Sequence, residues 1–368
     1  MRTTSLGLLA LVTVIAAAGA ILLPDNGGSI VPPAPPKPVS VLPGLKDWIG
    51  NADDLILRTS VNTVELTRQG QAPWTVAQKD NYPADPAKVA DLLKRLPTLE
   101  TVAPKTADPK LYRRLDVGGP DAHDHGDDPQ STLLSLKDSA KHQAALVIGK
   151  VHSDAISGSD DGAYVRQPDA ARSWLAKPSL QVSAQTLDWI DPTIVDIDPA
   201  TVTSIALQPA GAASASLTFS HPANAAAATP WHVEGIPASA KLKPGDSGAD
   251  LAALLHPLHL SDVGRSRRIT AKPDAMVHVT TKDGLQLAIS IFKLPDTKKP
   301  GPFPTGTWIE LQADGSGAAA ARAHDIDMKT GPWAYKIDDD TAKQLTESAA
   351  DIVEAPPAAP GKTPAAAQ

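Results

Sequence analysis

The sequence predicts an α+β fold: two repeated antiparallel-sheet units, each with one main helix, after a single N-terminal transmembrane helix. Three observations predict it: short alternating apolar segments that occur twice along the chain, one amphipathic helical segment in each copy, and one uncharged apolar run at the N-terminus. Proline accounts for 35 of the 368 residues, which argues against an all-helical bundle. We therefore expect short strands joined by turns.

The first copy begins with an alternating segment at residues 61–67, followed by Pro-Trp-Thr-Val at residues 73–76. Asp85 and Pro86 then supply an N-cap and a proline at the first helical position. One apolar helix face follows at i, i+3, i+4 and i+7 spacing: Val89, Leu92, Leu93 and Leu96. Further strands are predicted at residues 132–137, 146–149 and 164–166.

The second copy repeats this order, with a strand at residues 202–207, Pro-Trp-His-Val at 230–233 and a helix capped at 246–247. The apolar face of that helix has the same spacing: Leu251, Leu254, Leu255 and Leu258. More strands are predicted at 277–280, 287–291 and 308–310, with a Gly/Ala-rich loop at 314–323. We expect four tryptophans at equivalent positions to anchor the packing of the sheets: Trp74, Trp174, Trp231 and Trp333.

These patterns divide the chain into an N-terminal transmembrane anchor (1–23), a Pro-rich linker (24–47), a first α+β repeat (48–192), a second α+β repeat (193–353) and a disordered Ala/Pro tail (354–368). The apolar part of the anchor, residues 6–23, is long enough as a helix to cross a hydrocarbon core. Arg2 precedes it, so the predicted localisation is the inner (cytoplasmic) membrane, single-pass, with the bulk of the chain periplasmic. The alternative is a signal peptide cleaved at the small residues 16–20.

Several motifs lie at intervals along the first repeat: Trp74–Val76, Tyr82–Asp85, Leu92–Leu93, Arg114–Asp116, Val147–Gly149, Tyr164–Arg166 and Asp188–Asp191. In this respect the chain resembles a bacterial family described as a domain of unknown function, number 4340. The last motif is similar to that family's link into a second, looser copy. Arg114 stands where the family usually has glycine. The resemblance implies an accessory role beside ABC export systems of the gliding-motility type, which is an association rather than a mechanism.

No catalytic, cofactor-binding or metal-binding residue is assigned from the sequence. The best metal candidate is the acidic stretch 121–128, in which His123 and His125 can supply ligands together with aspartates. The competing interpretation is a solvated acidic loop without a rigid scaffold. The next candidate is the pair His256 and His259, against a simple placement near the end of the second helix.

A small basic cluster of Arg265, Arg267 and Arg268 either faces anionic headgroups or a partner, or lies on a solvated strand edge. The absence of cysteine excludes disulfides, thiolate metal sites and a cysteine nucleophile. The formal net charge of −7 disfavours nucleic acid as a partner. Catalytic signatures of metalloproteases, α/β-hydrolases and P-loop NTPases are missing, and Gly361-Lys362-Thr363 lacks the upstream glycine of a phosphate-binding loop.

The sequence therefore predicts no enzyme and no cofactor, but a membrane-anchored periplasmic accessory or scaffold protein of an ABC-type envelope/export complex, acting by protein–protein binding. The expected partners are the inner membrane, through the N-terminal helix, and an ABC permease with its extracytoplasmic subunits. Two alternatives stay open: lipid or glycan binding in a groove between the repeats, and a metal-dependent envelope hydrolase built on the histidines named above.

Overall fold

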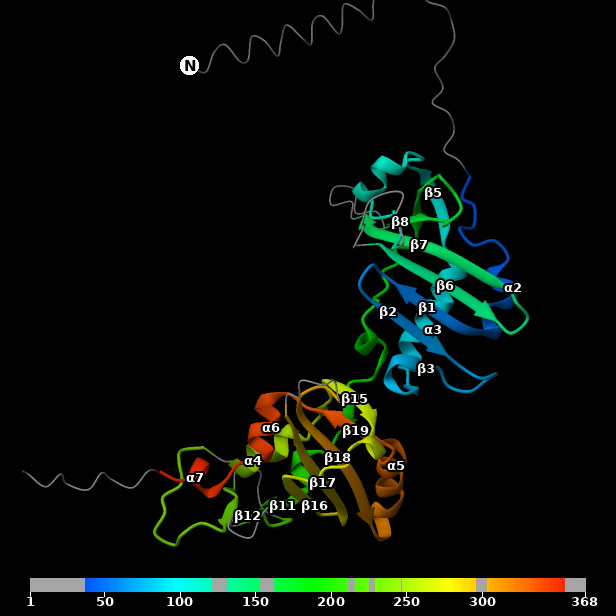
Figure 1. Ribbon diagram of the computed structural model, residues 1–368. Coiled ribbons are helices and arrows are strands. Elements are labelled where there is room, and N and C mark those ends of the chain that lie inside the picture. Colours follow the sequence, from blue (N-terminus) through cyan, green and yellow to red (C-terminus); the bar gives the residue numbers. More distant parts are fainter. Residues whose placement is uncertain are drawn as a thin grey trace, which may run out of the picture. The chain divides into compact units, whose positions relative to one another are not determined.

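A computed structural model of the protein describes residues 37–120, 131–152, 162–210, 216–224, 229–245, 247–295 and 303–354. All the elements below lie in the compact unit Val39–Gln368. They form two large antiparallel sheets, one two-stranded sheet and several short helices (Figure 1).

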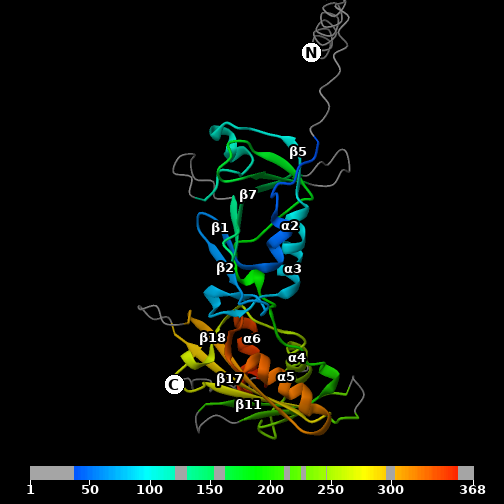
Figure 2. The same cartoon turned by 90° about the vertical axis from the view of Figure 1, so that its right-hand side faces the viewer.

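The first sheet has nine strands in the order β4-β3-β2-β1-β6-β7-β8-β9-β5. They are β1 (Ala52–Arg58), β2 (Thr63–Thr67), β3 (Thr75–Val76), β4 (Tyr82–Pro83), β5 (Glu100–Pro104), β6 (Thr132–Asp138), β7 (Gln143–His152), β8 (Gly162–Arg166) and β9 (Trp174–Lys177). Helix α3 (Pro86–Arg95) lies beside this sheet and contributes Val89 and Leu92 to its core (Figure 2). The short helix α2 (Leu45–Trp48) and 3₁₀ turns η1 (Ile49–Asn51), η2 (Ala77–Lys79), η3 (Leu96–Thr98), η4 (Pro109–Arg114) and η5 (Thr186–Trp189) complete this part.

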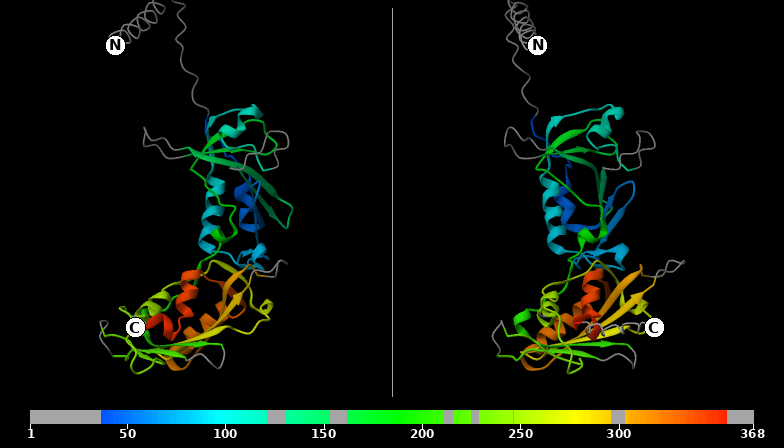
Figure 3. Two further views of the ribbon diagram at one scale, coloured as in Figure 1. Left: turned by 60° about the vertical axis from the view of Figure 1, so that its left-hand side comes forward. Right: turned by 90° about the vertical axis from the view of Figure 1, so that its left-hand side faces the viewer.

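The second large sheet has eight strands in the order β13-β12-β11-β16-β17-β18-β19-β15. They are β11 (Val202–Pro209), β12 (Leu217–Ser220), β13 (His232–Glu234), β15 (Asp262–Arg265), β16 (Ala275–Thr281), β17 (Leu285–Leu294), β18 (Gly306–Gly315) and β19 (Trp333–Lys336). Helices α4 (Ser247–Leu254), α5 (Ala320–Thr330) and α6 (Asp339–Leu345) pack against its strands (Figure 3), and α7 (Ala349–Ile352) follows. The 3₁₀ turns here are η6 (Pro199–Thr201), η7 (Ser266–Arg268) and η8 (Gly317–Ala319).

The strand orders of the two sheets correspond position by position. The first sheet reads β3-β2-β1-β6-β7-β8-β9-β5 after its edge strand β4, and the second reads β13-β12-β11-β16-β17-β18-β19-β15. In both sheets the first strand, β1 or β11, lies between the strand that follows it in the chain and a strand formed after the main helix. Both sheets end on a strand that comes soon after the main helix: β5 directly after α3, and β15 after α4 and β14. The burial of alternate residues, as along β16, explains why each strand keeps its register: a shift by one residue would turn its apolar side chains to solvent.

The predicted fold class needs correction in its sheets and helices. The structure contains a third sheet, in which β10 (Thr193–Val195) pairs with β14 (Leu258–His259). The second helix ends at Leu254, so Leu258 belongs to a strand and not to the helix face. The Gly/Ala-rich segment expected as a loop at 314–323 instead contains the end of β18, η8 and the start of α5. Alanine has the highest helix propensity, and the sheet buries Ala323, which together explain this helix.

The predicted membrane span also needs correction. No helix in the described ranges is long and apolar enough to cross a membrane. The prediction of a single-pass inner-membrane protein is therefore wrong for this part of the chain. The expected anchor at 1–23, most of the linker at 24–47, the stretch 121–128 and the tail after residue 354 lie outside the described residues.

The start of the first main helix is confirmed. The Asp85 carboxylate accepts hydrogen bonds from the backbone N–H groups of Ala87 and Lys88, and Pro86 occupies the first turn. The four tryptophans expected to anchor the sheets also lie in or against the core: Trp74 and Trp333 are buried in it, and Trp174 and Trp231 are partly buried and pack against it.

Gly149 of β7 permits a close approach between the sheet and the turn after η4. A Cβ atom at this position would lie 2.1 Å from the carbonyl oxygen of Leu115 and 2.7 Å from that of Asp116. Both obstacles are backbone atoms, and the Lys150 N–H donates a hydrogen bond to the same Leu115 oxygen (3.2 Å). The Val-Ile-Gly and Arg-Leu-Asp motifs therefore meet in space as one packing unit.

We predict that Gly149→Ala lowers the free energy of unfolding by about 3 kcal/mol, because the backbone of the turn must move away from the new methyl group. Urea denaturation monitored by circular dichroism measures this. Gly50→Ala is the matched control, because nothing lies within 4 Å of its added Cβ, and we expect it to change stability by less than about 0.5 kcal/mol. Equal effects of the two substitutions would contradict the packing argument.

Candidate functional site

Arg166, which ends the Tyr-Val-Arg motif on β8, is buried, with 7% of its surface exposed. Its guanidinium donates five hydrogen bonds of 2.8 to 3.2 Å to the carbonyl oxygens of Val117, Gly118, Gln167, Pro168 and Ala170. The guanidinium carbon also lies 4.7 Å from the centre of the Tyr112 ring. Burial lowers the pKa of Arg166, although the side chain stays charged at neutral pH. Arg166 therefore joins two loops of the first repeat and has its donors engaged inside the fold.

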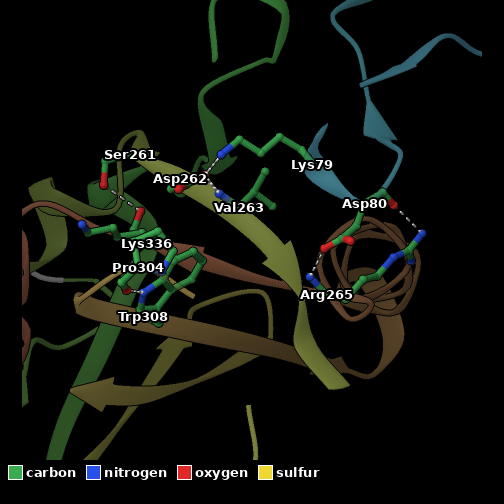
Figure 4. A network of polar contacts seen from close by, with 9 residues as sticks. All are labelled: Lys79, Asp80, Ser261, Asp262, Val263, Arg265, Pro304, Trp308 and Lys336. Atoms are coloured by element: carbon green, nitrogen blue, oxygen red, sulfur yellow. Dashed lines mark hydrogen bonds and ion pairs between the residues drawn. The ribbon is translucent and has the colours of Figure 1, made fainter. Parts of the chain in front are cut away.

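Charged side chains connect the β3–β4 region with β15 and η7. We call the set Lys79, Asp80, Asp262, Arg265 and Arg268 the charged cluster, and Figure 4 shows its first four members. Lys79 Nζ lies 2.5 Å from Asp262 Oδ1, and both side chains are largely buried, with 20% and 15% exposed. Asp262 Oδ1 also accepts a hydrogen bond from the backbone N–H of Val263 (2.7 Å). The pair is therefore partly shielded from solvent and stronger than an exposed ion pair.

Asp80 is the second centre of the charged cluster. Its backbone adopts φ = 56°, in the left-handed region that aspartate tolerates better than most residues. Its Oδ2 accepts a hydrogen bond from the Arg265 N–H (3.4 Å), its carbonyl oxygen accepts one from Arg265 Nη2 (3.3 Å), and its Oδ1 pairs with Arg268. This turn thus presents one aspartate to two arginines that lie 185 and 188 residues later in the chain.

Aromatic side chains extend the charged cluster into the core. The Tyr82 ring stands edge-on to Trp333 with centroids 4.8 Å apart, and the Arg265 guanidinium carbon lies 3.9 Å from the Trp333 ring centre. The Tyr335 ring lies edge-on to the Tyr82 ring, with the ring centroids 6.3 Å apart. Burial raises the pKa of both tyrosines, most strongly that of Tyr335, so both phenols stay neutral across the physiological range. These contacts bury one face of the arginine and leave its charge directed at Asp80.

The structure therefore resolves the interpretation of the three arginines. Arg265 and Arg268 bind Asp80 within the chain, and Arg267 is exposed. Sequence reasoning missed Asp80 as their partner. The only local signal is the Asp80-Asn81 pair, whose side chains suit a left-handed turn.

Two cavities of ligand size lie elsewhere. One, of about 560 Å³, is lined by α2, β6 and β7. Trp48, which lines it, stacks on His142 with the ring centroids 5.7 Å apart. The other, of about 440 Å³, lies in the second repeat, is lined by His221, Trp231 and His256 among others, and will be called the α4 cavity. Smaller cavities of about 220 Å³ beside α3 and about 350 Å³ between α4 and α6 are also present.

The predicted histidine pair does not form one site. His256 Nδ1 pairs with the carboxylate of Asp196, whereas His259 lies on β14 opposite Thr193 and is exposed. Within the described ranges, no group of three or more His, Asp or Glu side chains is placed to hold a metal ion. His123 and His125 lie outside those ranges. His221 and Asp196, which accompany His256 at or near the α4 cavity, were not singled out by sequence reasoning, because their partners are distant along the chain.

We predict a measurable coupling energy between Lys79 and Asp262. In a double-mutant cycle with Lys79→Met and Asp262→Asn, the coupling should be about 1 kcal/mol, because the two charges are partly desolvated. The exposed i,i+4 pair Asp91 and Arg95 on α3 is the control and should give about 0.3–0.5 kcal/mol. Urea unfolding of each variant provides the free energies, and a Lys79–Asp262 coupling no larger than that of the control would contradict the cluster's role.

Comparison with known proteins adds one finding about family. A search of curated proteins finds no match for the chain. The matched family segment starts at Trp74 and ends at His256, and therefore includes each motif noted above together with the first part of the second repeat. The family model that matches residues 74–256 is Domain of unknown function (DUF4340).

Proposed function

We propose that this protein is an accessory scaffold of an ABC-type export complex that acts by protein–protein binding and catalyses no reaction. The observation that carries the proposal is that residues of the family motifs make structural contacts inside the protein. Arg166 is occupied by backbone carbonyl groups, Gly149 is needed for a close backbone contact, and Asp85 caps α3. When the motif residues of a family stabilise the fold and do not line a reaction centre, we expect its members to act by binding other proteins at their surface.

The charged cluster supports the same proposal. It joins the β4 end of the first sheet to the β15 edge of the second through two carboxylates and three cations. Because Arg265 and Trp333 are packed against each other, this contact combines charge with buried aromatic surface. A scaffold needs such contacts, because a flexible surface loses more conformational entropy when a partner binds, which weakens binding.

Strand β13 is the surface that we propose for partner binding. The outer edge of β5 is partly covered by residues 39–41, and β15 receives Asp80. By contrast, β13 is the terminal strand of its sheet and pairs only with β12 in the described part of the chain. His232 and Glu234 on this strand are exposed, which leaves polar groups beside an open backbone edge. An extended segment of the exporter's extracytoplasmic subunit would add to this edge as one more strand.

The alternatives from the sequence have less support. The four cavities described above each lie within one repeat, so none of them is the predicted groove between the repeats. The metal-dependent hydrolase has no support from the described histidines, because His256 and His259 have separate surroundings.

Site-specific photocrosslinking in the native cell tests the scaffold proposal. We expect a photoreactive residue in place of Glu234 on β13 to form an adduct with a subunit of an ABC-type exporter, identified by mass spectrometry. The same residue in place of Met328 is the control, because Met328 is 67% exposed on α5, away from the β13 edge of the sheet order.

An adduct that is missing at position 234, or equally abundant at position 328, contradicts binding at β13. Adducts with proteins unrelated to export would contradict the assigned partner class. Affinity purification of the full chain without crosslinking gives the parallel readout, and an exporter subunit should be enriched there over an unrelated bait.

A further inference from the structure

The α4 cavity has the size and the lining of a small-molecule site. Its volume of about 440 Å³ falls within the range usual for ligand pockets, roughly 300–1,000 Å³. Trp231 and Pro222 contribute apolar surface, and Asp198, Thr203 and His256 contribute polar groups. The residues come from η6, β11, α4 and the segments around β12 and β13, so the site is assembled by the fold of the second repeat.

The Trp231 indole is held as a fixed platform. It lies directly against α4 at Gly248, where an added Cβ would come within 2.5 Å of the indole ring. On another side it contacts the His221 imidazole, with centroids 5.2 Å apart and planes inclined by 35°. Trp231 remains partly exposed, and it lines the cavity. An aromatic surface that is held in place before binding costs little conformational entropy when a ligand stacks on it.

Three polar side chains that line the cavity donate their hydrogen bonds to other groups of the protein. Thr203 Oγ1 donates a hydrogen bond to the Thr280 carbonyl oxygen (3.1 Å). His221 Nε2 donates to the Thr229 carbonyl oxygen (3.1 Å), and His256 Nδ1 donates to the Asp196 carboxylate. In the neutral imidazoles, the other ring nitrogens are therefore acceptors: Nδ1 of His221 and Nε2 of His256.

Asp198 adds more acceptor capacity. Its Oδ1 accepts one hydrogen bond, from the Ala200 N–H (2.9 Å), whereas a carboxylate has about four acceptor positions. No lysine or arginine is found among the described residues that line the cavity. The lining thus suits a neutral ligand that donates hydrogen bonds, and it lacks the cations that bind phosphate or carboxylate groups.

We propose that the α4 cavity binds a saccharide unit of a glycan. A pyranose ring has one face of C–H groups, which packs on the Trp231 indole, and a rim of hydroxyl groups, which donate to acceptors on Asp198, Thr203, His221 and His256. The proposal is independent of partner binding at β13. It concerns a cavity inside the second repeat and differs from the groove between repeats considered above.

Saturation-transfer NMR on the purified full chain tests the proposal. The probes are methyl glycosides of glucose, galactose and N-acetylglucosamine, together with their 1→4-linked disaccharides; choline is included as a cationic probe. We expect saturation transfer to the ring C–H protons of at least one sugar, and a loss of affinity of about tenfold or more in Trp231→Ala. Trp48→Ala is the matched control, because Trp48 also lines a cavity and stacks on a histidine, His142, and it should bind as the wild type does.

A second variant separates loss of the site from loss of the fold. Ala249 is exposed on α4 and lines the cavity, so Ala249→Leu should fill the site, abolish transfer and leave the thermal melting curve unchanged. The proposal is overturned if none of the sugars shows transfer, if Ala249→Leu and Trp48→Ala affect it equally, or if choline alone binds at Trp231. Failure here leaves the scaffold proposal standing, since crosslinking at position 234 does not depend on a sugar.

Discussion

The whole architecture depends on one constraint: each large sheet has alternating apolar side chains on one face, and that face has to be removed from water. The strands β6 and β16 bury every second residue, and β1 and β11 do so after one irregularity near their start; leucine, valine and isoleucine occupy most of these buried positions. Antiparallel pairing satisfies their backbone groups, but it does not cover the apolar face. Helices and turns cover that face, and the two sheets are covered by different sets of helices.

The first sheet is covered mainly by α3, whose buried face includes Val89 and Leu92. The second has α4 in the equivalent place, but α4 is shorter and carries Gly248, against which Trp231 packs. Helices α5 and α6 make up the difference by packing on β17 and β18. The same strand order is thus compatible with different helical layers, and the α4 cavity lies beside the shorter helix of the second repeat.

Polar residues have a comparable division of roles. Arg166 is buried and bound to carbonyl groups of nearby loops, so it stabilises the interior of one repeat. Arg265 and Arg268 are bound by Asp80 across a long sequence separation, so they stabilise a tertiary contact. The α4 cavity differs from both, because its polar groups are oriented by internal acceptors and still retain lone pairs on residues that line an open space. That difference distinguishes structural polar groups from those available to a ligand.

The sequence by itself determined the local features of this protein. The cap at Asp85, the apolar spacing of α3 and the alternation of the strands depend on neighbours within a few residues, which propensity and periodicity report directly. It misjudged the Ala-rich segment that becomes α5, because alanine and glycine together suggest a loop until a sheet face is present to be covered. Only the tertiary structure decided that Asp80 binds two arginines, that Leu258 joins a third sheet, and that His221, Trp231 and His256 share a cavity. Each of those outcomes depends on residues far apart in the chain, whose meeting is set by the burial of the sheets rather than by any local pattern.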